Sequence, residues 1–545
     1  MKTIVIVRSF LADYIRNPVN VVLLVVVPTV FVVVVSGSLA KFSELLGGGQ
    51  GSAVETVTAG WAAAFLAGIA MYFQTAATRA TDRRLVVAGL PARRLVAARL
   101  GAGMVLAALA SAAALLALAL RTGIGQPQRA VAGTLMFAVI YVAVGAAVGS
   151  LSRNPVNGTV IVMFIWILDV FFGPAMGSAD LVVTRGLPTH FVTLWMVDLP
   201  SRHAGQLAAL GWSLAWVVAA IAGAWLLATS RTRTFQRNPA ARPPGSARAQ
   251  SAAALRAVWC EARRNPAQWA LFVVVPVVFI LMAVAVTPNK PIAVTVTEGG
   301  RRLLRALPMA DVHAASMAPI AIGSLTALAG LFAFLDSRAG DRRAALAGFR
   351  PQALITARLG VLWVMALAAT GIALGTTWLV FDAQNWWTYA AANVLIALTY
   401  SLVGALLAPL FGRVGGIFVA FLLPFLDLGI VQSPMLHPVP STLSRFLPGY
   451  GGSRVLLDGA FTRGFDTAVP LLIALAWLVA LTAVVASVYN RAIAGADQQN
   501  GDPVSASSPA DAAGSPSASG SSSDSHTPRH VTSSRGAAPL VGAKH

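Results

Sequence analysis

The sequence predicts an all-α polytopic membrane protein with twelve transmembrane helices, arranged as two parallel-oriented repeats of six helices each. Of its 545 residues, 57% are hydrophobic and only 11% are charged, and the mean hydropathy of +0.73 lies far above that of soluble globular domains. The apolar residues form runs of about 20, the length that crosses a bilayer as a helix. The second half of the chain also repeats charged motifs and prolines of the first half.

A hydropathy window of about 19 residues places the spans in chain order. The first half holds 19–38, 57–78, 100–120, 130–151, 156–177 and 207–229, and the second half holds 267–287, 313–335, 359–381, 388–411, 414–432 and 467–489. The domains follow as a six-span domain over 1–240, a cytoplasmic linker over 241–255, a second six-span domain over 256–495 and a tail over 496–545. The tail has almost no large apolar side chains, so we expect it to be disordered and cytoplasmic.

The 40 Lys and Arg residues outnumber the 20 Asp and Glu residues and give a net charge of +20. In a soluble protein this excess would indicate nucleic acid, but here most basic residues fall in alternate loops, which become cytoplasmic when the N-terminus is inside. We therefore expect a multi-pass protein of the cell (plasma) membrane with both termini cytoplasmic and no nucleic-acid partner. The exception is an outer cluster at Lys290, Arg301, Arg302 and Arg305.

The repeat is visible residue by residue. Arg16-Asn17-Pro18 matches Arg264-Asn265-Pro266, and the triplet Asp82-Arg83-Arg84 matches Asp341-Arg342-Arg343, 259 residues later. Further matches pair Arg99 with Arg358, Tyr141 with Tyr400, Gly145 with Gly404, Asp169 with Asp427 and Pro188 with Pro448. A repeat with an even number of spans keeps its orientation, so the sequence predicts an internal duplication about an axis along the membrane normal, with a translocation path on that axis.

The loops between the second and third spans of each half combine charge with a Gly and Pro break. The first loop carries Asp82, Arg83 and Arg84, then Gly89 and Pro91; the second carries Asp341, Arg342 and Arg343, then Gly348 and Pro351. Basic loops that merely obey the positive-inside rule would explain the arginines. A cytosolic docking element would also explain the aspartates. The segments 1–17 and 248–265, before the first span of each half, fit interfacial helices or simple turns.

Two carboxylates, Asp169 and Asp427, lie inside the fifth span of each half. A charged group in the membrane costs about 2.5 to 3.5 kcal/mol, so each must face protein, water or a counter-charge. We expect them to line the axis or to pair with Arg185 and Arg445, or to form a structural pair at the outer mouth. The outer segments that follow, with Pro188 and Pro448, fit either short re-entrant helices or plain extracellular loops.

The sequence carries no enzyme constellation. None of its four lysines lies in a G-x-x-x-x-G-K-[ST] phosphate-binding loop, and its histidines lack metal-ligand spacing. A single cysteine, Cys260, excludes an internal disulfide. We therefore expect a chain that is not an enzyme, has no nucleotide-binding motif of its own and holds no metal or cofactor.

Taken together, these elements resemble the permeases of type 2 ATP-binding-cassette (ABC-2) exporters. The resemblance rests on Arg16-Asn17-Pro18, on Asp82-Arg83 with Gly89 and Pro91, and on Leu187-Pro188, each with its counterpart in the second half. It implies that the charged loops couple to a separate cassette ATPase, in two copies, which binds the ATP. It also implies outward movement of a small hydrophobic substrate: drug, antibiotic or lipid efflux. Two departures are Asp at positions where Glu is more usual, and two permeases fused in one chain.

A proton-coupled secondary transporter of the major facilitator type is the alternative, because that class also has two parallel six-span halves. Asp336 to Arg343 partly resembles its charged loop motif, although the first-half loop lacks the glycine. A membrane scaffold or a flippase-like protein without energy coupling is the third class.

Overall fold

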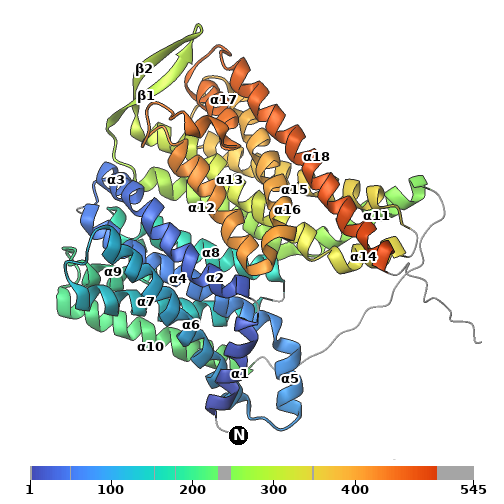
Figure 1. The fold of residues 1–545 in the computed structure, drawn as a ribbon. Helices are drawn as coiled ribbons and strands as arrows, with labels where there is room; N and C mark the ends of the chain where they lie inside the picture. The colour runs from blue at the N-terminus through green and yellow to red at the C-terminus, as the bar shows by residue number, and fades with distance from the viewer. Residues whose placement is uncertain are drawn as a thin grey trace, which may run out of the picture. The chain divides into compact units, whose positions relative to one another are not determined.

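Long helices dominate the computed structural model (Figure 1), which describes residues 3–16, 18–48, 51–152, 154–177, 179–230, 247–346 and 349–499. The chain divides into two units, Met1–Ala496 and Asp497–His545. The predicted tail therefore lies almost entirely outside the described residues, as does most of the stretch that joins the two halves.

The first half contains α1 (Thr3–Ile15), α2 (Pro18–Val30), the π-helix η1 (Phe31–Val35), α3 (Ser36–Leu46), α4 (Gly51–Ala77), α5 (Arg79–Val87), α6 (Ala92–Arg121), α7 (Pro127–Leu151), α8 (Pro155–Phe172), the 3-10 turns η2 (Pro174–Met176) and η3 (Val183–Gly186), α9 (His190–Met196) and α10 (Gln206–Ser230). The second half contains α11 (Ala247–Arg263), α12 (Pro266–Val286), the strands β1 (Pro291–Glu298) and β2 (Arg301–Pro308), α13 (Met309–Leu335), α14 (Arg338–Leu346), α15 (Pro351–Trp378), α16 (Trp386–Pro424), the π-helix η4 (Phe425–Val431), the 3-10 turn η5 (Leu443–Phe446), α17 (Gly449–Phe461) and α18 (Ala468–Gln499).

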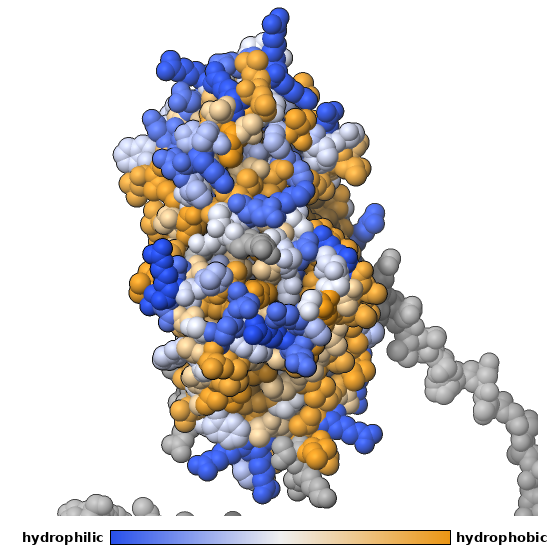
Figure 2. All heavy atoms as spheres, turned by 90° about the vertical axis from the view of Figure 1, so that its left-hand side faces the viewer, coloured by the Kyte–Doolittle hydropathy of each residue, from blue (hydrophilic) through white to orange (hydrophobic). Residues whose placement is uncertain are grey.

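Eleven helices in the described part of the chain are long and apolar enough to cross a membrane. The twelfth expected span, 414–432, corresponds to the shorter apolar helix Gly415–Val431. This helix continues α16 past Gly412, whose φ of +64° interrupts the helical backbone. The protein is thus an all-α, multi-pass membrane protein in its spanning region, and Figure 2 shows large hydrophobic areas on one of its faces.

The burial of the spans follows the same order in both halves. In their most apolar windows, 94% of α4 and 89% of α13 are buried, whereas only 17% of the sixth span is buried in each half, that is, in α10 and α18. The second span of each half is therefore central and the sixth peripheral. The exposed apolar side chains of α10 and α18, such as Val218 and Val479, are those that lipid would cover.

Close backbone approach explains why one glycine recurs in each half. A Cβ at Gly145 of α7 would lie 2.1 Å from the carbonyl oxygen of Gly68 in α4. A Cβ at Gly404 of α16 would lie 1.8 Å from the carbonyl oxygen of Ala327 in α13. Only glycine permits these contacts, as is usual where membrane helices pack tightly.

The Arg-Asn-Pro motif marks the start of a helix. In the second half, the Asn265 side chain accepts a hydrogen bond from the backbone N–H of Gln268, and Pro266 is the first residue of α12. An Asn N-cap followed by Pro at the first helical position is a strong start signal. The preceding segments are helical in both halves, as α1 and α11, rather than simple turns.

A β-hairpin that the sequence analysis did not predict lies between α12 and α13. β1 and β2 pair antiparallel from Pro291↔Pro308 to Glu298↔Arg301. The turn between them consists of Gly299 and Gly300, both with positive φ, as a two-residue hairpin turn requires. The outer basic cluster belongs to this hairpin.

The two halves contact each other along several helices. α8 packs on α12 and α13, and α2 packs on α16. Asn157 and Asn265 exchange two amide hydrogen bonds across this junction, of 2.7 and 3.2 Å. Deeper along it, the rings of Phe65 and Phe418 meet edge to face with centroids 4.7 Å apart.

Candidate functional site

The aspartates of the two charged loops are held by arginines of the following span. Arg99 on α6 donates through Nε to Asp82 Oδ2 at 2.7 Å and through Nη2 to Oδ1, and the Phe10 ring lies 4.2 Å from its guanidinium carbon. Arg358 on α15 donates in the same two-pronged way to Asp341, at 2.7 and 2.6 Å. We call these the Asp–Arg braces. Paired hydrogen bonds between guanidinium and carboxylate fix both distance and orientation.

The braces change the interpretation of the loops. The Asp82 side chain is 16% exposed and that of Asp341 only 5%, so neither carboxylate is a free contact point for another protein. Their role is to fasten α5 to α6 and α14 to α15. Sequence reasoning missed Arg99 and Arg358 as partners, although both recur at the same spacing as the aspartates.

Where the structure describes them, the glycine and proline residues of these loops form the turns between the helices. Gly89 has φ of +94°, its N–H bonds to Val86 O, and Leu90 N–H bonds to Leu85 O, which together close a left-handed helix end. Pro91 is the N-cap of α6 and Pro351 the first residue of α15. The predicted site residues Arg84, Arg342 and Arg343 are exposed. Gly348 and the side chain of Arg83 lie outside the described residues.

Buried tyrosine hydroxyls, rather than arginines, hold the aspartates of the fifth spans. Tyr141 donates to Asp169 Oδ2 at 2.7 Å, and Tyr400 donates to Asp427 Oδ2 at 2.6 Å. The expected pairing with Arg185 and Arg445 is therefore wrong. A tyrosine and an aspartate recur together in both halves, and this recurrence was the signal in the sequence that could have indicated the pair.

Each of these aspartates also accepts a backbone N–H at the start of the next short helix. Thr189 N–H, at the N-cap of α9, reaches Asp169 Oδ1 at 3.4 Å, and Gly449 N–H, at the first residue of α17, reaches Asp427 Oδ2 at 2.8 Å. A negative charge is favourable at a helix start. Pro188 directly precedes this position in the first half, and Pro448 is the N-cap of α17. The outer segments thus contain helices, anchored to the fifth span.

Arg185 and Arg445 occupy matching 3-10 turns, η3 and η5, just before these helices. In the first half, His190 at the start of α9 lies with its Nε2 3.2 Å from that of His203. Burial, with smaller contributions from His203 and Arg185, lowers the pKa of His190 to about 4. The described residues contain no cluster of His, Cys, Asp or Glu suited to a metal ion.

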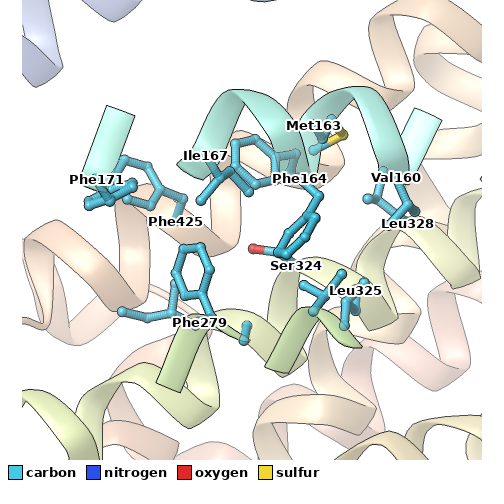
Figure 3. A pocket seen from close by; sticks show the side chains of 14 residues that line it. Val160, Met163, Phe164, Ile167, Phe171, Phe279, Ser324, Leu325, Leu328 and Phe425 are labelled. Atoms are coloured by element: carbon cyan, nitrogen blue, oxygen red, sulfur yellow. The ribbon is translucent and has the colours of Figure 1, made fainter. Parts of the chain in front are cut away.

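An apolar cavity lies between the halves (Figure 3). Its walls come from α8, α12, α13, α16 and η4, and its volume is about 30 Å³. The lining residues are Val160, Met163, Phe164, Ile167, Phe171, Val275, Phe279, Ile320, Ala321, Ser324, Leu325, Leu328, Phe421 and Phe425. Asp169 and Asp427 are not among them.

Ser324 is the polar group of this cavity. Its side-chain oxygen is buried and makes no hydrogen bond within the described part of the chain, and Figure 3 shows it among the aromatic and aliphatic side chains. A buried hydroxyl without a partner is unfavourable by about 1 to 3 kcal/mol, so it is poised to bond an incoming polar atom.

Comparison with known protein families finds a match in the first half of the chain. Residues 37–229 match the family model described as "ABC-2 family transporter protein". The matched range extends from α3 to α10 and includes the first Asp–Arg brace, Asp169 and α9. No curated protein matches the chain.

Proposed function

Since residues 37–229 match the ABC-2 transporter family model, we propose that this chain supplies both membrane halves of an ATP-binding-cassette exporter. The observation that carries the proposal beyond the matched residues is the recurrence of the Asp–Arg brace, Asp82 with Arg99 and Asp341 with Arg358, at one spacing of 259 residues. A duplicated permease accounts for the two braces, for the two Tyr–Asp pairs and for the same order of burial among the spans of each half. The family match favours this function over the major facilitator alternative.

Two copies of a separate ATPase would dock on α5 and α14, one copy under each half. Because the two aspartates are paired with arginines in the braces, we expect exposed side chains of α5 and α14 to contact the ATPase. On α5 these include Arg84 and Val87, whose side chain is 83% exposed. On α14 they include Arg342 and Arg343. ATP binds to the ATPase, and the chain itself is not an enzyme.

The apolar cavity is our candidate for the solute path. Its walls suit a small hydrophobic solute such as a drug, an antibiotic or a lipid, which Ser324 would orient by one hydrogen bond. Pockets for drug-sized molecules measure about 300 to 1,000 Å³, far more than the 30 Å³ found here. The structure therefore corresponds to a closed arrangement, and α8 must part from α13 before a solute enters. ATP-driven movement would release the solute outward, with both termini on the cytoplasmic side of the plasma membrane.

The test is to purify the chain with its co-eluting proteins and to measure ATP hydrolysis and solute efflux from vesicles. We expect a cassette ATPase to co-elute. The variant Arg84→Glu with Arg343→Glu should abolish co-elution and ATP-driven efflux. Arg202→Glu is the matched control, since its side chain is 93% exposed and lies in a loop at the opposite end of the spans. Efflux driven by a proton gradient, without any ATPase, would refute the proposal.

Ser324→Ala tests the path separately. Removal of the hydroxyl should weaken transport of solutes with a hydrogen-bond acceptor more than transport of solutes without one, whereas ATPase binding should not change. Equal effects on both classes of solute would exclude Ser324 from the path.

A further inference from the structure

A second cavity, of about 260 Å³, lies at one end of the second half, beside α14. Arg338 and Arg342 line it from α14, Leu406 and Pro409 from α16, and Val485 and Val488 from α18. The two arginines are one helical turn apart and so share one side of α14. The cavity thus combines two arginines and the carboxylate of Asp341 on one wall with aliphatic and aromatic side chains on the others.

The negative charges near these arginines are already paired. Asp341 accepts hydrogen bonds from Arg358 and, at 2.5 Å, from the Tyr489 hydroxyl. Asp336, the other acidic residue of this loop, pairs with Arg413. Arg338 and Arg342 are exposed and form no ion pair within the described ranges. Their charge is therefore available to an anion.

The cavity lies where three of the candidate membrane-spanning helices end. The spanning part of α13 ends at Leu335, one turn before Arg338, and those of α16 and α18 end at Arg413 and Arg491. Three spans therefore reach the membrane boundary around the cavity. Its apolar walls come from these spans, and α18 is a peripheral helix that lipid would surround.

The described residues of the first half differ from this arrangement at two matching positions. Arg79, at the position of Arg338, donates hydrogen bonds to the carbonyl oxygens of Gly149 and Ser152. Ala228 stands where the second half has Tyr489. The lining residues of the cavity therefore differ between the two halves at these two positions.

We propose that this cavity binds the phosphate of an anionic phospholipid headgroup, with Arg338 and Arg342 as its ligands and the lipid chains along Leu406 and Val488. Basic pockets between membrane helices at the boundary recognise such headgroups. The site would make the conformation of α14 depend on membrane lipid.

The test measures lipid binding to the purified full chain, without any ATPase, by native mass spectrometry with phosphatidylglycerol and phosphatidylethanolamine. We expect phosphatidylglycerol to bind more tightly. Arg338→Gln with Arg342→Gln should weaken its binding about 30-fold, because each basic residue near the surface contributes roughly a factor of five. Arg93→Gln with Arg94→Gln, which removes two exposed charges from the first turn of α6 in the first half, should leave it unchanged.

Leu406→Trp keeps both charges but fills the cavity, and it should also weaken phosphatidylglycerol binding. An equal loss in the Arg93 and Arg94 control would show general surface attraction and overturn the proposal. Unchanged binding in the Arg338 and Arg342 variant would overturn it as well. Inorganic phosphate or glycerol 3-phosphate that bound as tightly as phosphatidylglycerol would overturn the assignment to a lipid.

Discussion

Tyr400 donates a 2.6 Å hydrogen bond to the carboxylate of Asp427, and both side chains are almost completely buried. The same carboxylate receives the N–H of Gly449 at the start of α17. One aspartate thus connects the fourth span, the fifth span and the short helix that follows. The equivalent contacts of Tyr141 with Asp169 give the first half the same three-way connection.

Loss of the tyrosine hydroxyl should destabilise the protein. Tyr400→Phe removes one partner from a buried carboxylate, which costs about 1 to 3 kcal/mol. We expect a lower thermal midpoint for the purified protein in detergent. Tyr450→Phe is the control, because the hydroxyl of this buried tyrosine makes no hydrogen bond within the described part of the chain. Equal midpoints for Tyr400→Phe and the control would contradict a stabilising role of the pair.

The sequence was sufficient to predict the spans, because hydropathy over about 20 residues depends little on tertiary contacts. The partner of each aspartate was harder to predict. Asp169 and Tyr141 lie on different helices, and only packing shows that they meet. The repeat gave an indication of this contact, because a tyrosine and an aspartate recur together in both halves. Spacing alone, however, does not distinguish a contact from a coincidence.

The β-hairpin was overlooked although its signal is present. Ile292, Val294 and Val296 alternate with smaller or polar residues, and Gly299-Gly300 separates this run from the next. Alternation around a Gly-Gly pair predicts a hairpin. In a chain of apolar helices, a hydropathy window averages over so short a pattern. The partners of Asp82 and Asp341 were also missed: the structure places both carboxylates in braces, and docking on these loops stays a prediction.

Gly404→Ala should destabilise the second half. The new Cβ would lie 1.8 Å from the carbonyl oxygen of Ala327, so α16 must move away from α13. Overpacking of this kind costs about 1 to 3 kcal/mol. Gly371→Ala in α15 is the matched control, because its Cβ would have no neighbour within 4 Å. Thermal unfolding in detergent measures both, and a control as destabilising as Gly404→Ala would contradict the steric explanation.

Acidification should weaken the protein through His190. Its pKa is about 4 in the folded protein, below its ordinary value of 6.5, so the unfolded chain binds this proton more readily. The stability that the neutral His190 contributes is therefore fully present above pH 6.5 and is lost as the pH falls towards 4. His190→Gln should reduce this part of the pH dependence of the thermal midpoint. The control His437→Gln, which changes a histidine of the second half, should leave the pH dependence of the thermal midpoint as in the unmodified protein. If His437→Gln reduced this pH dependence as much as His190→Gln does, the effect could not be assigned to His190.

The two Asp–Arg braces should differ in strength. Asp341 is the more buried aspartate and accepts a hydrogen bond from the Tyr489 hydroxyl at 2.5 Å, whereas the additional donor of Asp82, the Thr78 hydroxyl, lies at 3.3 Å. Removal of one partner from a buried ion pair costs about 3 to 5 kcal/mol, and water around the more exposed Asp82 should reduce its cost. We therefore expect Asp341→Asn to lower the thermal midpoint more than Asp82→Asn does. Tyr489→Phe should account for part of the difference, because it removes the closer of the two additional donors. If Tyr489→Phe leaves the thermal midpoint unchanged and Asp341→Asn still lowers it more than Asp82→Asn, burial alone explains the difference between the braces. If Asp82→Asn lowers the midpoint more than Asp341→Asn, the predicted order of the braces is wrong.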